Sequence, residues 1–249
     1  MALFEIVAAT LFVSLLSLLG IVFFFFDKKR VEALMMPLVG FSTGAILGAA
    51  FFDLLPESIG AVGAPGALAA AFVGVICAFV MEKVVHLHHH HHIDHEGEHK
   101  HPLGMLTMAG DAFHNFFDGV AISAGFIAGM PVGITTTVAV IFHEIPHEIG
   151  NYSLLLYSGY ERKAALRFNF LTGLSAVAGG VLFYFFAAQV KGLEAWALAF
   201  TAGTFIYIAA ADLFPELHKE KDVRGSLLQL ACVLIGAALI LAISHFMAA

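Results

Sequence analysis

The sequence predicts an all-α, polytopic membrane protein with eight transmembrane helices. The first observation is composition: the 249 residues are 60% hydrophobic and 12% charged, with a mean hydropathy of +0.89, unlike a soluble domain. The second is that apolar runs of about 20 residues, the length that crosses the hydrocarbon core, recur along the chain. An outer-membrane barrel would show shorter segments of alternating polarity. The predicted helices span residues 3–26, 34–55, 63–85, 103–127, 131–157, 164–188, 193–214 and 226–247, in one domain.

The first predicted helix, residues 3–26, is expected to remain as a transmembrane helix. It begins Met-Ala-Leu-Phe-Glu, without the basic region of a signal peptide, and its apolar run is longer than the core of a cleaved signal. Cys77 and Cys232 fall inside the third and eighth predicted helices. Two such cysteines provide no disulfide framework, so we interpret them as small core residues.

The positive charges predict the orientation of the chain. Of the 12 Lys and Arg residues, all except Lys191 lie beside loops that follow odd-numbered predicted helices. The positive-inside rule therefore places these loops in the cytoplasm and both termini on the non-cytoplasmic side of the cell (inner or plasma) membrane. The lipid bilayer is the expected surrounding, and a net charge of −7 with no basic patch excludes nucleic acid as a partner. The oligomeric state is left open, with a homodimer as one alternative.

The loop between the third and fourth predicted helices, residues 86–101, is rich in histidine. It holds most of the 14 His residues together with Asp94, Glu96 and Glu98. Such a polar composition argues against a fixed fold, and His-rich tracts bind metal ions. We interpret it as a cytoplasmic loop that accepts or senses metal, with a solvated linker as the alternative.

An internal repeat relates the second and seventh predicted helices. Phe41–Gly44 leads to Asp53–Glu57, and Phe200–Gly203 leads to Asp212–Glu216 over the same spacing. The two copies share Phe, Gly, Asp, Leu, Pro and Glu at matching positions. Because the two helices would cross the membrane in opposite directions, the repeat has inverted topology. We expect helices one to three to be related to helices six to eight, with four and five between them in a 3+2+3 arrangement.

The fourth and fifth predicted helices carry polar side chains in the middle of apolar runs. Residues three and four apart share a helix face, and polar groups are expensive in lipid, so these stripes imply a function. The short turn at residues 128–131 makes the two helices antiparallel neighbours, so their stripes are expected to face each other near the bilayer midplane. The stripes consist of Asp111, His114, Asn115 and Asp118 on the fourth helix, and of His143 and His147 beside Glu144 and Glu148 on the fifth.

These residue types predict a metal site. Imidazole together with carboxylate favours borderline first-row divalent ions, above all Zn²⁺, with Fe²⁺ and Mn²⁺ as alternatives. Pro146 lies inside the fifth-helix cluster. A mid-helix proline cannot donate its hydrogen bond and frees the carbonyl four residues back, that of Phe142, which then offers a further oxygen ligand.

The pattern His114-Asn115-x-x-Asp118-Gly119 and the run from His143 to Glu148, HEIPHE, resemble the ZIP (Zrt-, Irt-like protein) family of divalent metal transporters. The second motif is similar to the subgroup with two histidines, and the resemblance covers nearly the whole chain. It implies a transporter and not an enzyme, carrying Zn²⁺ into the cytoplasm as a substrate by alternating access. Fe²⁺, Mn²⁺ and Cd²⁺ are further candidate ions, and no separate cofactor is implied.

The resemblance also implies a binuclear site within the membrane. It assigns helices one, four, five and six to a metal-carrying bundle that moves against a scaffold of helices two, three, seven and eight. Glu148 is interpreted as a group that orients a histidine, and Asp111 as a similar group or a guide for the ion. One metal would be held by His114, Asp118, His143 and His147, and the neighbouring one by Asn115, Asp118, Glu144 and His147, with Asn169 as an additional ligand.

An intramembrane zinc metalloprotease is the alternative from another class. His143-Glu144-x-x-His147 is formally the pattern in which two histidines bind Zn²⁺ and the glutamate activates water. Pro146 inside the motif is unusual for such a helix, and His114 would crowd the open position that a catalytic Zn²⁺ needs. The sequence therefore favours transport.

Overall fold

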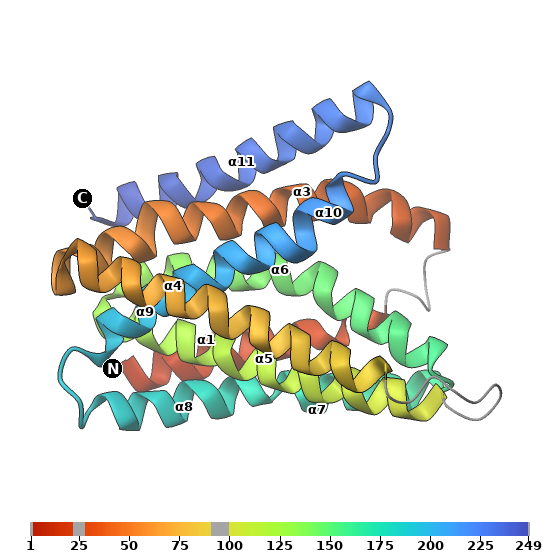
Figure 1. Cartoon of the computed structure of the whole chain (residues 1–249), viewed down its shortest axis with the longest axis horizontal. Helices are drawn as coiled ribbons and strands as arrows, with labels where there is room; N and C mark the ends of the chain where they lie inside the picture. The colour runs from red at the N-terminus through yellow and green to blue at the C-terminus, as the bar shows by residue number, and fades with distance from the viewer. Residues whose placement is uncertain (1, 22–27, 91–99, 249) are drawn as a thin grey trace.

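The protein is built from helices that lie side by side along one long axis (Figure 1). The structure, a computed structural model, describes residues 2–21, 28–90 and 100–248. Within these ranges every regular element is a helix, which confirms the all-α class. The elements are α1 (Ala2–Leu16), η1 (Ser17–Ile21), α3 (Lys28–Ala49), η2 (Ala50–Leu54), α4 (Leu55–His90), α5 (Lys100–Ala128), α6 (Met130–Tyr157), α7 (Arg162–Gly173), α8 (Ser175–Ala187), α9 (Leu193–Ile208), η3 (Ala209–Leu213), α10 (Phe214–Leu217) and α11 (Val223–Ala248).

Several helical segments are suited to a bilayer. Five are long and apolar enough to cross a membrane: Ala2–Leu19, Met36–Val84, Arg162–Ala187, Leu193–Leu217 and Val223–Phe246. The helices α5 and α6 are not among them, because the polar clusters interrupt their apolar runs. The protein is therefore a multi-pass membrane protein, while the count of eight crossings and the 3+2+3 arrangement stay predictions.

A break at Gly63 divides α4 into two parts. Gly63 has φ 78° and ψ 155°, a conformation that glycine adopts without steric cost, and Pro65 follows in the first turn of the second part, a position that proline tolerates. The predicted loop before residue 63 is helical instead, because α3 continues through η2 into α4 and the backbone first leaves the helical conformation at Gly63. The chain reverses direction in this region (Figure 1), so the long span Met36–Val84 contains two antiparallel rods.

The predicted repeat has a structural counterpart in two π-helical turns. The turn η2 follows α3 and contains Asp53, and the turn η3 follows α9 and contains Asp212. Single π-helical turns are rare in α-helices and are often found at functional sites. Figure 1 shows that α3 and α9 run in opposite directions. The two turns at matching positions support the inverted repeat.

The helices α3 and α9 also resemble each other in how closely each packs against a neighbouring helix. The helix α3 packs along α11, and α9 packs along α4. A Cβ atom added to Gly44 would lie 1.9 Å from the carbonyl oxygen of Val233, and one added to the equivalent Gly203 would lie 1.9 Å from that of Ala71. Helix association in lipid depends on such close contact, because lipid chains are as apolar as the side chains. Each pair therefore depends on glycine at its crossing.

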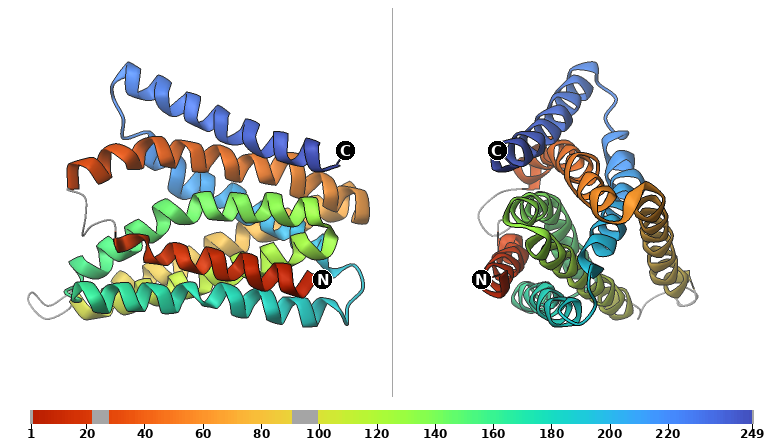
Figure 2. Two further views of the ribbon diagram at one scale, coloured as in Figure 1. Left: turned by 180° about the vertical axis from the view of Figure 1, so that it is seen from behind. Right: turned by 90° about the vertical axis from the view of Figure 1, so that its left-hand side faces the viewer.

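The remaining helices form a second group in which α5 packs on α6 and α8, and α1 packs on α8 and α6. The right-hand view of Figure 2, which looks along the helices, shows α11 and α3 on one side of the molecule and α1 and α8 on the other. Between the two groups lies an apolar core that includes Ile46, Leu54, Ile122, Val140 and Phe205.

The sixth predicted helix is interrupted. It consists of α7 and α8, which meet at Leu174. The carbonyl oxygen of Gly173, at the end of α7, accepts a hydrogen bond from Ser14 Oγ at 2.7 Å. Ser14 of α1 thus provides a hydrogen-bond partner for a carbonyl at the interruption. The interruption also brings the last turns of α7 next to the polar stripes of α5 and α6. The predicted His-rich loop falls mainly between α4 and α5, and residues 91–99 lie outside the described residues.

Candidate metal site

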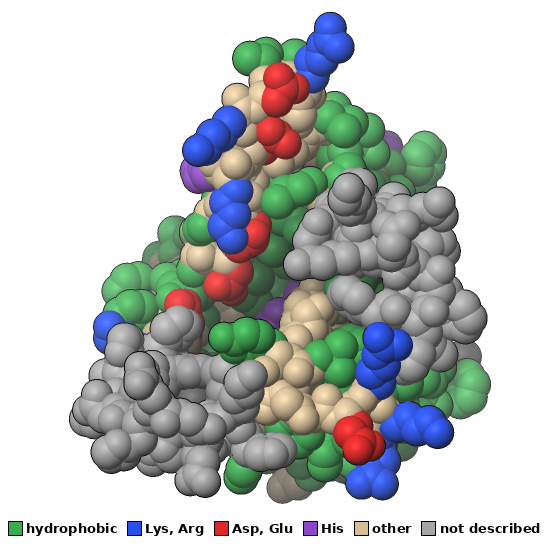
Figure 3. Space-filling view, turned by 90° about the vertical axis from the view of Figure 1, so that its right-hand side faces the viewer, with side chains coloured by type: hydrophobic (Ala, Val, Ile, Leu, Met, Phe, Trp, Pro, Cys, Tyr) green, Lys and Arg blue, Asp and Glu red, His purple; other side chains and the backbone are tan. Residues whose placement is uncertain are grey.

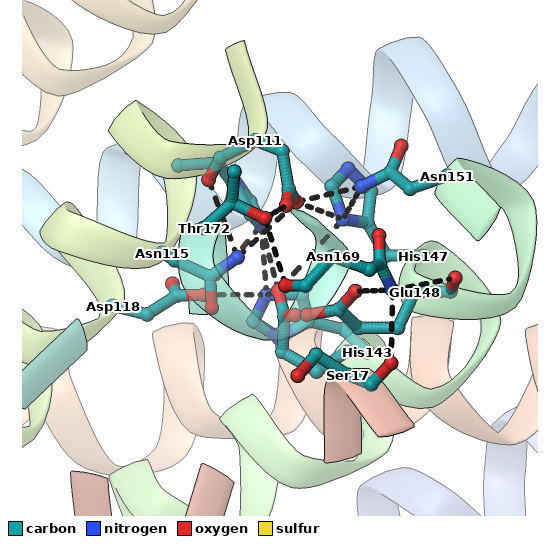
Figure 4. Close-up of polar contacts among 12 residues, drawn as sticks. Ser17, Asp111, Asn115, Asp118, His143, His147, Glu148, Asn151, Asn169 and Thr172 are labelled. Atoms are coloured by element: carbon teal, nitrogen blue, oxygen red, sulfur yellow. Dashed lines mark hydrogen bonds and ion pairs between the residues drawn. The ribbon is translucent and has the colours of Figure 1, made fainter. Parts of the chain in front are cut away.

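Four side chains from α5 and α6 meet at one centre, which we call the ligand group: His114, Asp118, His143 and Glu144. Both helices contribute two residues, because the predicted stripes do face each other (Figure 4). One ligand atom from each residue lies within 4.8 Å of the others. His114 Nε2 is 3.1 Å from Glu144 Oε1, and His143 Nε2 is 3.3 Å from Asp118 Oδ2. Two nitrogens and two oxygens can therefore converge on one ion.

The ligand group is buried and rich in acceptor oxygens. Asp118, His143 and Glu144 are all at most 3% exposed. Among the described residues, Asp118 Oδ2 and both carboxylate oxygens of Glu144 accept no hydrogen bond of regular geometry. Buried carboxylates without such partners cost several kcal/mol, and a divalent cation would offset this cost. The donor set of imidazole and carboxylate fits Zn²⁺.

A contact with the backbone of α6 orients the His143 ring. His143 Nδ1 lies 3.2 Å from the carbonyl oxygen of Ala139, one turn earlier in α6. This contact assigns the proton to Nδ1 and directs the Nε2 lone pair to the centre, an arrangement common for metal-binding histidines.

Asp111 is the hub of a second set of bonds beside the ligand group. Its Oδ1 accepts hydrogen bonds from Asn115 Nδ2 at 3.2 Å and from Asn151 Nδ2 at 2.6 Å, and its Oδ2 accepts one from Thr172. Both carboxylate oxygens are therefore engaged by neutral donors. Sequence reasoning singled out Asp111 and Asn115 but missed Asn151, which lies one turn after His147 and was detectable by spacing, and Thr172, which was not.

His147 stands beside the ligand group and not within it. Its Nδ1 lies 3.3 Å from Asn151 Nδ2 and 3.6 Å from Asp111 Oδ1, whereas the nearest oxygen of Glu144 is 4.0 Å away. The side chain of His147 is 39% exposed. The grouping therefore differs from the two sets drawn from the family resemblance, because Glu144 joins His114, Asp118 and His143 in place of His147.

Asn169 contacts Glu148 instead of the ligand group. Its Nδ2 donates to Glu148 Oε2 at 2.6 Å and to the carbonyl oxygen of Ser17 at 3.0 Å. Glu148 and Asn169 are both buried. These bonds join η1, α6 and α7 beside the site, so the structure gives Asn169 a role in holding Glu148.

The carbonyl of Phe142 is engaged, in contrast to the expectation that it offers a metal ligand. Pro146 does remove its helical partner, but the hydroxyl of Ser42 on α3 donates a hydrogen bond to Phe142 O. The expectation missed this because no sequence pattern shows which side chain of a distant helix faces a freed carbonyl.

A cavity of about 860 Å³ reaches the ligand group between α4, α5, α6 and α9. Its wall includes His114 and Asp118 of the ligand group together with Glu82, Tyr207 and Asp212. Tyr207 donates a hydrogen bond to Glu82 Oε2 at 2.5 Å. Figure 3 looks onto the end of the molecule where α4 and α10 finish, and it shows Lys and Arg side chains around a hollow.

Buried imidazole and carboxylate ligands between the helices of a multi-pass membrane protein, next to a cavity, define a membrane protein with a candidate site for divalent metal ions. The chain belongs to the ZIP zinc transporter family. The family model described as ZIP Zinc transporter matches residues 3–105 and 101–244, which confirms the resemblance based on the helix-four and helix-five motifs. Members of this family are named as transporters, so the family assignment also confirms the expectation that the chain is not an enzyme.

Individual relatives are also named as zinc transporters. The chain is 40% identical over 149 residues to zinc transporter SLC39A7 of Rattus norvegicus, covering 57% of this chain and 32% of the relative. It is 40% identical over 146 residues to zinc transporter zipt-7.2 of Caenorhabditis elegans, covering 57% of this chain and 31% of the relative. It is 30% identical over 226 residues to zinc transporter ZIP13 of Pongo abelii, covering 84% and 66%. The chain thus spans about a third of the length of the first two relatives.

Proposed function

We propose that this protein transports Zn²⁺ across a cell membrane through the ligand group of His114, Asp118, His143 and Glu144. The observation that carries the proposal is the convergence of two imidazoles and two carboxylates in a buried centre between α5 and α6. Such a set of charges is unfavourable inside a bilayer unless a cation binds there. Membership of the ZIP family supports transport as the activity, and the names of its relatives support zinc as the transported ion.

The same site is proposed to exchange ions between two positions. His147 and Asn115 lie next to the ligand group, and Asn115 Oδ1 accepts no hydrogen bond from the described residues. Of these two side chains, His147 lines the cavity and is the one that an ion leaving the first position in that direction would meet. Asn169 is retained as a candidate only for a state of the site in which its bond to Glu148 is broken.

Import into the cytoplasm by alternating access is part of the proposal. Glu82 and Asp212 line the cavity that reaches the ligand group, and the positive-inside rule assigns the ends of α4 and α9 next to them to the cytoplasm. The structure would then correspond to an inward-facing state, with both termini on the opposite side. A second state, open at the Asp53 end, is required for transport. Cysteine labelling of each terminus in intact cells tests this orientation.

The metalloprotease alternative is not supported by the site. A protease of that pattern binds Zn²⁺ through His143 and His147 together. Here the nitrogens nearest each other belong to His114 and His143, with Nε2 atoms 3.2 Å apart. The family assignment independently points to transport.

Uptake of radioactive zinc into liposomes that contain the purified protein tests the proposal. The variants His143→Ala and Asp118→Ala are compared with wild type, with Fe²⁺, Mn²⁺ and Cd²⁺ as competitors and with His245→Ala, an exposed histidine of α11, as the matched control. We expect saturable uptake in wild type and His245→Ala and none in the two site variants. Wild-type uptake in His143→Ala would refute the site, and the absence of uptake in every protein would refute the function.

A further inference from the structure

The bond between Ser42 and the carbonyl of Phe142 connects two parts of the molecule that differ in role. Ser42 belongs to α3, which packs along α11, whereas Phe142 belongs to α6 and directly precedes His143 and Glu144. Ser42 is fully buried. The bond therefore reaches from a helix that carries no member of the ligand group to the turn that carries two of them.

The carbonyl of Phe142 needs a partner because of Pro146. In a regular helix the N–H of residue 146 would donate to it, and proline has none. A buried carbonyl without a partner costs about as much as a lost hydrogen bond, and the turn around it is free to tilt. In the structure the hydroxyl of Ser42 takes the place of the missing N–H.

Packing around the bond is consistent with a fixed position. The rings of Phe41 and Phe142 meet edge to face with centroids 4.4 Å apart, a favourable geometry for an aromatic pair. The neighbouring Thr43 is equally buried, but its hydroxyl donates to Val39 O of its own helix at 2.7 Å. Of these two adjacent hydroxyl groups, only that of Ser42 crosses to the ligand-bearing helix.

We propose that Ser42 is a positioning residue for metal binding: by replacing the hydrogen bond that Pro146 removes, its hydroxyl holds the turn of α6 that bears His143 and Glu144 at the distance the ion requires. The inference rests on the proposed function for its consequence in transport. It goes beyond that function because the hydrogen bond of Ser42 is to the backbone of Phe142 and not to a side chain of the ligand group. Small displacements of ligands weaken binding strongly, since a metal site requires its geometry to be preorganised.

A double-mutant cycle between Ser42 and Pro146 tests the inference. Pro146→Ala restores an N–H that can donate to Phe142 O, so it should make the Ser42 hydroxyl redundant. Four proteins are compared, wild type, Ser42→Ala, Pro146→Ala and the double variant, by the dissociation constant for Zn²⁺ in detergent and by KM and the maximal rate of uptake. Circular dichroism and gel filtration confirm that each is helical and monodisperse.

We expect Ser42→Ala to raise the zinc dissociation constant and KM roughly three- to tenfold, the effect of one buried hydrogen bond, with the maximal rate changed less. In the Pro146→Ala background the same substitution should change either value by less than about twofold. Thr43→Val, which removes the neighbouring hydroxyl, should bind zinc as wild type does.

A dissociation constant unchanged in Ser42→Ala would overturn the inference, and so would an equal loss in both backgrounds. An equal loss in Thr43→Val would show that α3 responds to any lost hydroxyl and would also overturn it. If the wild-type protein binds zinc but takes up none, the proposed function fails, while the four dissociation constants still decide the role of Ser42.

Discussion

The pair α5–α6 and the pairs α3–α11 and α4–α9 are held together in different ways. Between α5 and α6 the contact includes buried carboxylates and imidazoles in the middle of the helices, which stabilise each other poorly in a bilayer without a cation. In the other two pairs the backbones approach so closely that glycine is required at the crossing. The comparison teaches that the first pair is built for an ion and the other two for the stability of the fold.

The two kinds of contact should therefore respond differently to substitution. Removing a polar side chain from the α5–α6 pair removes a ligand and also a buried charge or dipole, so the fold loses little. Adding a methyl group at a glycine crossing leaves every ligand in place but forces two helices apart. Function and stability should change independently in the two sets of variants.

The largest effect is expected for His143→Ala on zinc uptake. His143 contributes one of two nitrogens to the ligand group and is 2% exposed. Losing a ligand should cost more than the 10- to 100-fold that outer partners of metal ligands typically cost, so uptake should fall by at least about 100-fold. The melting temperature in detergent without zinc should stay near the wild-type value. A collapse of melting temperature together with uptake would break the comparison.

The next effect is expected for Gly44→Ala on stability. The added Cβ would lie 1.9 Å from the carbonyl oxygen of Val233, so α3 and α11 must separate, at a cost of about 1–3 kcal/mol or more. Melting in detergent should show a clear decrease, and Gly203→Ala should show a similar one. Gly60→Ala, where an added Cβ meets nothing within 4 Å, is the control. Equal stability of Gly44→Ala and Gly60→Ala would contradict the account of the crossings.

A smaller effect is expected for Asp111→Asn. Its carboxylate accepts hydrogen bonds from Asn115, Asn151 and Thr172, and an amide cannot accept at both terminal atoms. Because these partners lie beside the ligand group, zinc affinity should decrease about tenfold. Isothermal titration with Zn²⁺ measures it, with Asp222→Asn on the exposed surface as the control. Complete loss of zinc binding would instead make Asp111 a ligand.

Much of this arrangement could be predicted from the sequence. Helical spacing placed His114 and Asp118 on one face of α5 and His143 on a polar face of α6. The short turn between the two helices predicted that these faces meet. The repeated Asp53 and Asp212 also pointed to paired helices, which the two π-helical turns support.

The remaining features depend on contacts between distant segments. Spacing within α6 cannot show that His147 turns toward Asn151 and Asp111 and away from Glu144, since both positions lie within reach of one side chain. It also cannot show that Ser42 donates to Phe142 O. The interruption of the sixth helix at Leu174 likewise contains no proline, and the carbonyl of Gly173 accepts a hydrogen bond from Ser14 of a distant helix.

The most direct test of the central claim is a crystal structure of the zinc-loaded protein with anomalous diffraction at the zinc edge. The account predicts a peak between α5 and α6 at roughly 2.0–2.2 Å from nitrogen or oxygen atoms of His114, Asp118, His143 and Glu144, absent in His143→Ala. Strong zinc peaks elsewhere, with none between these four side chains, would contradict it.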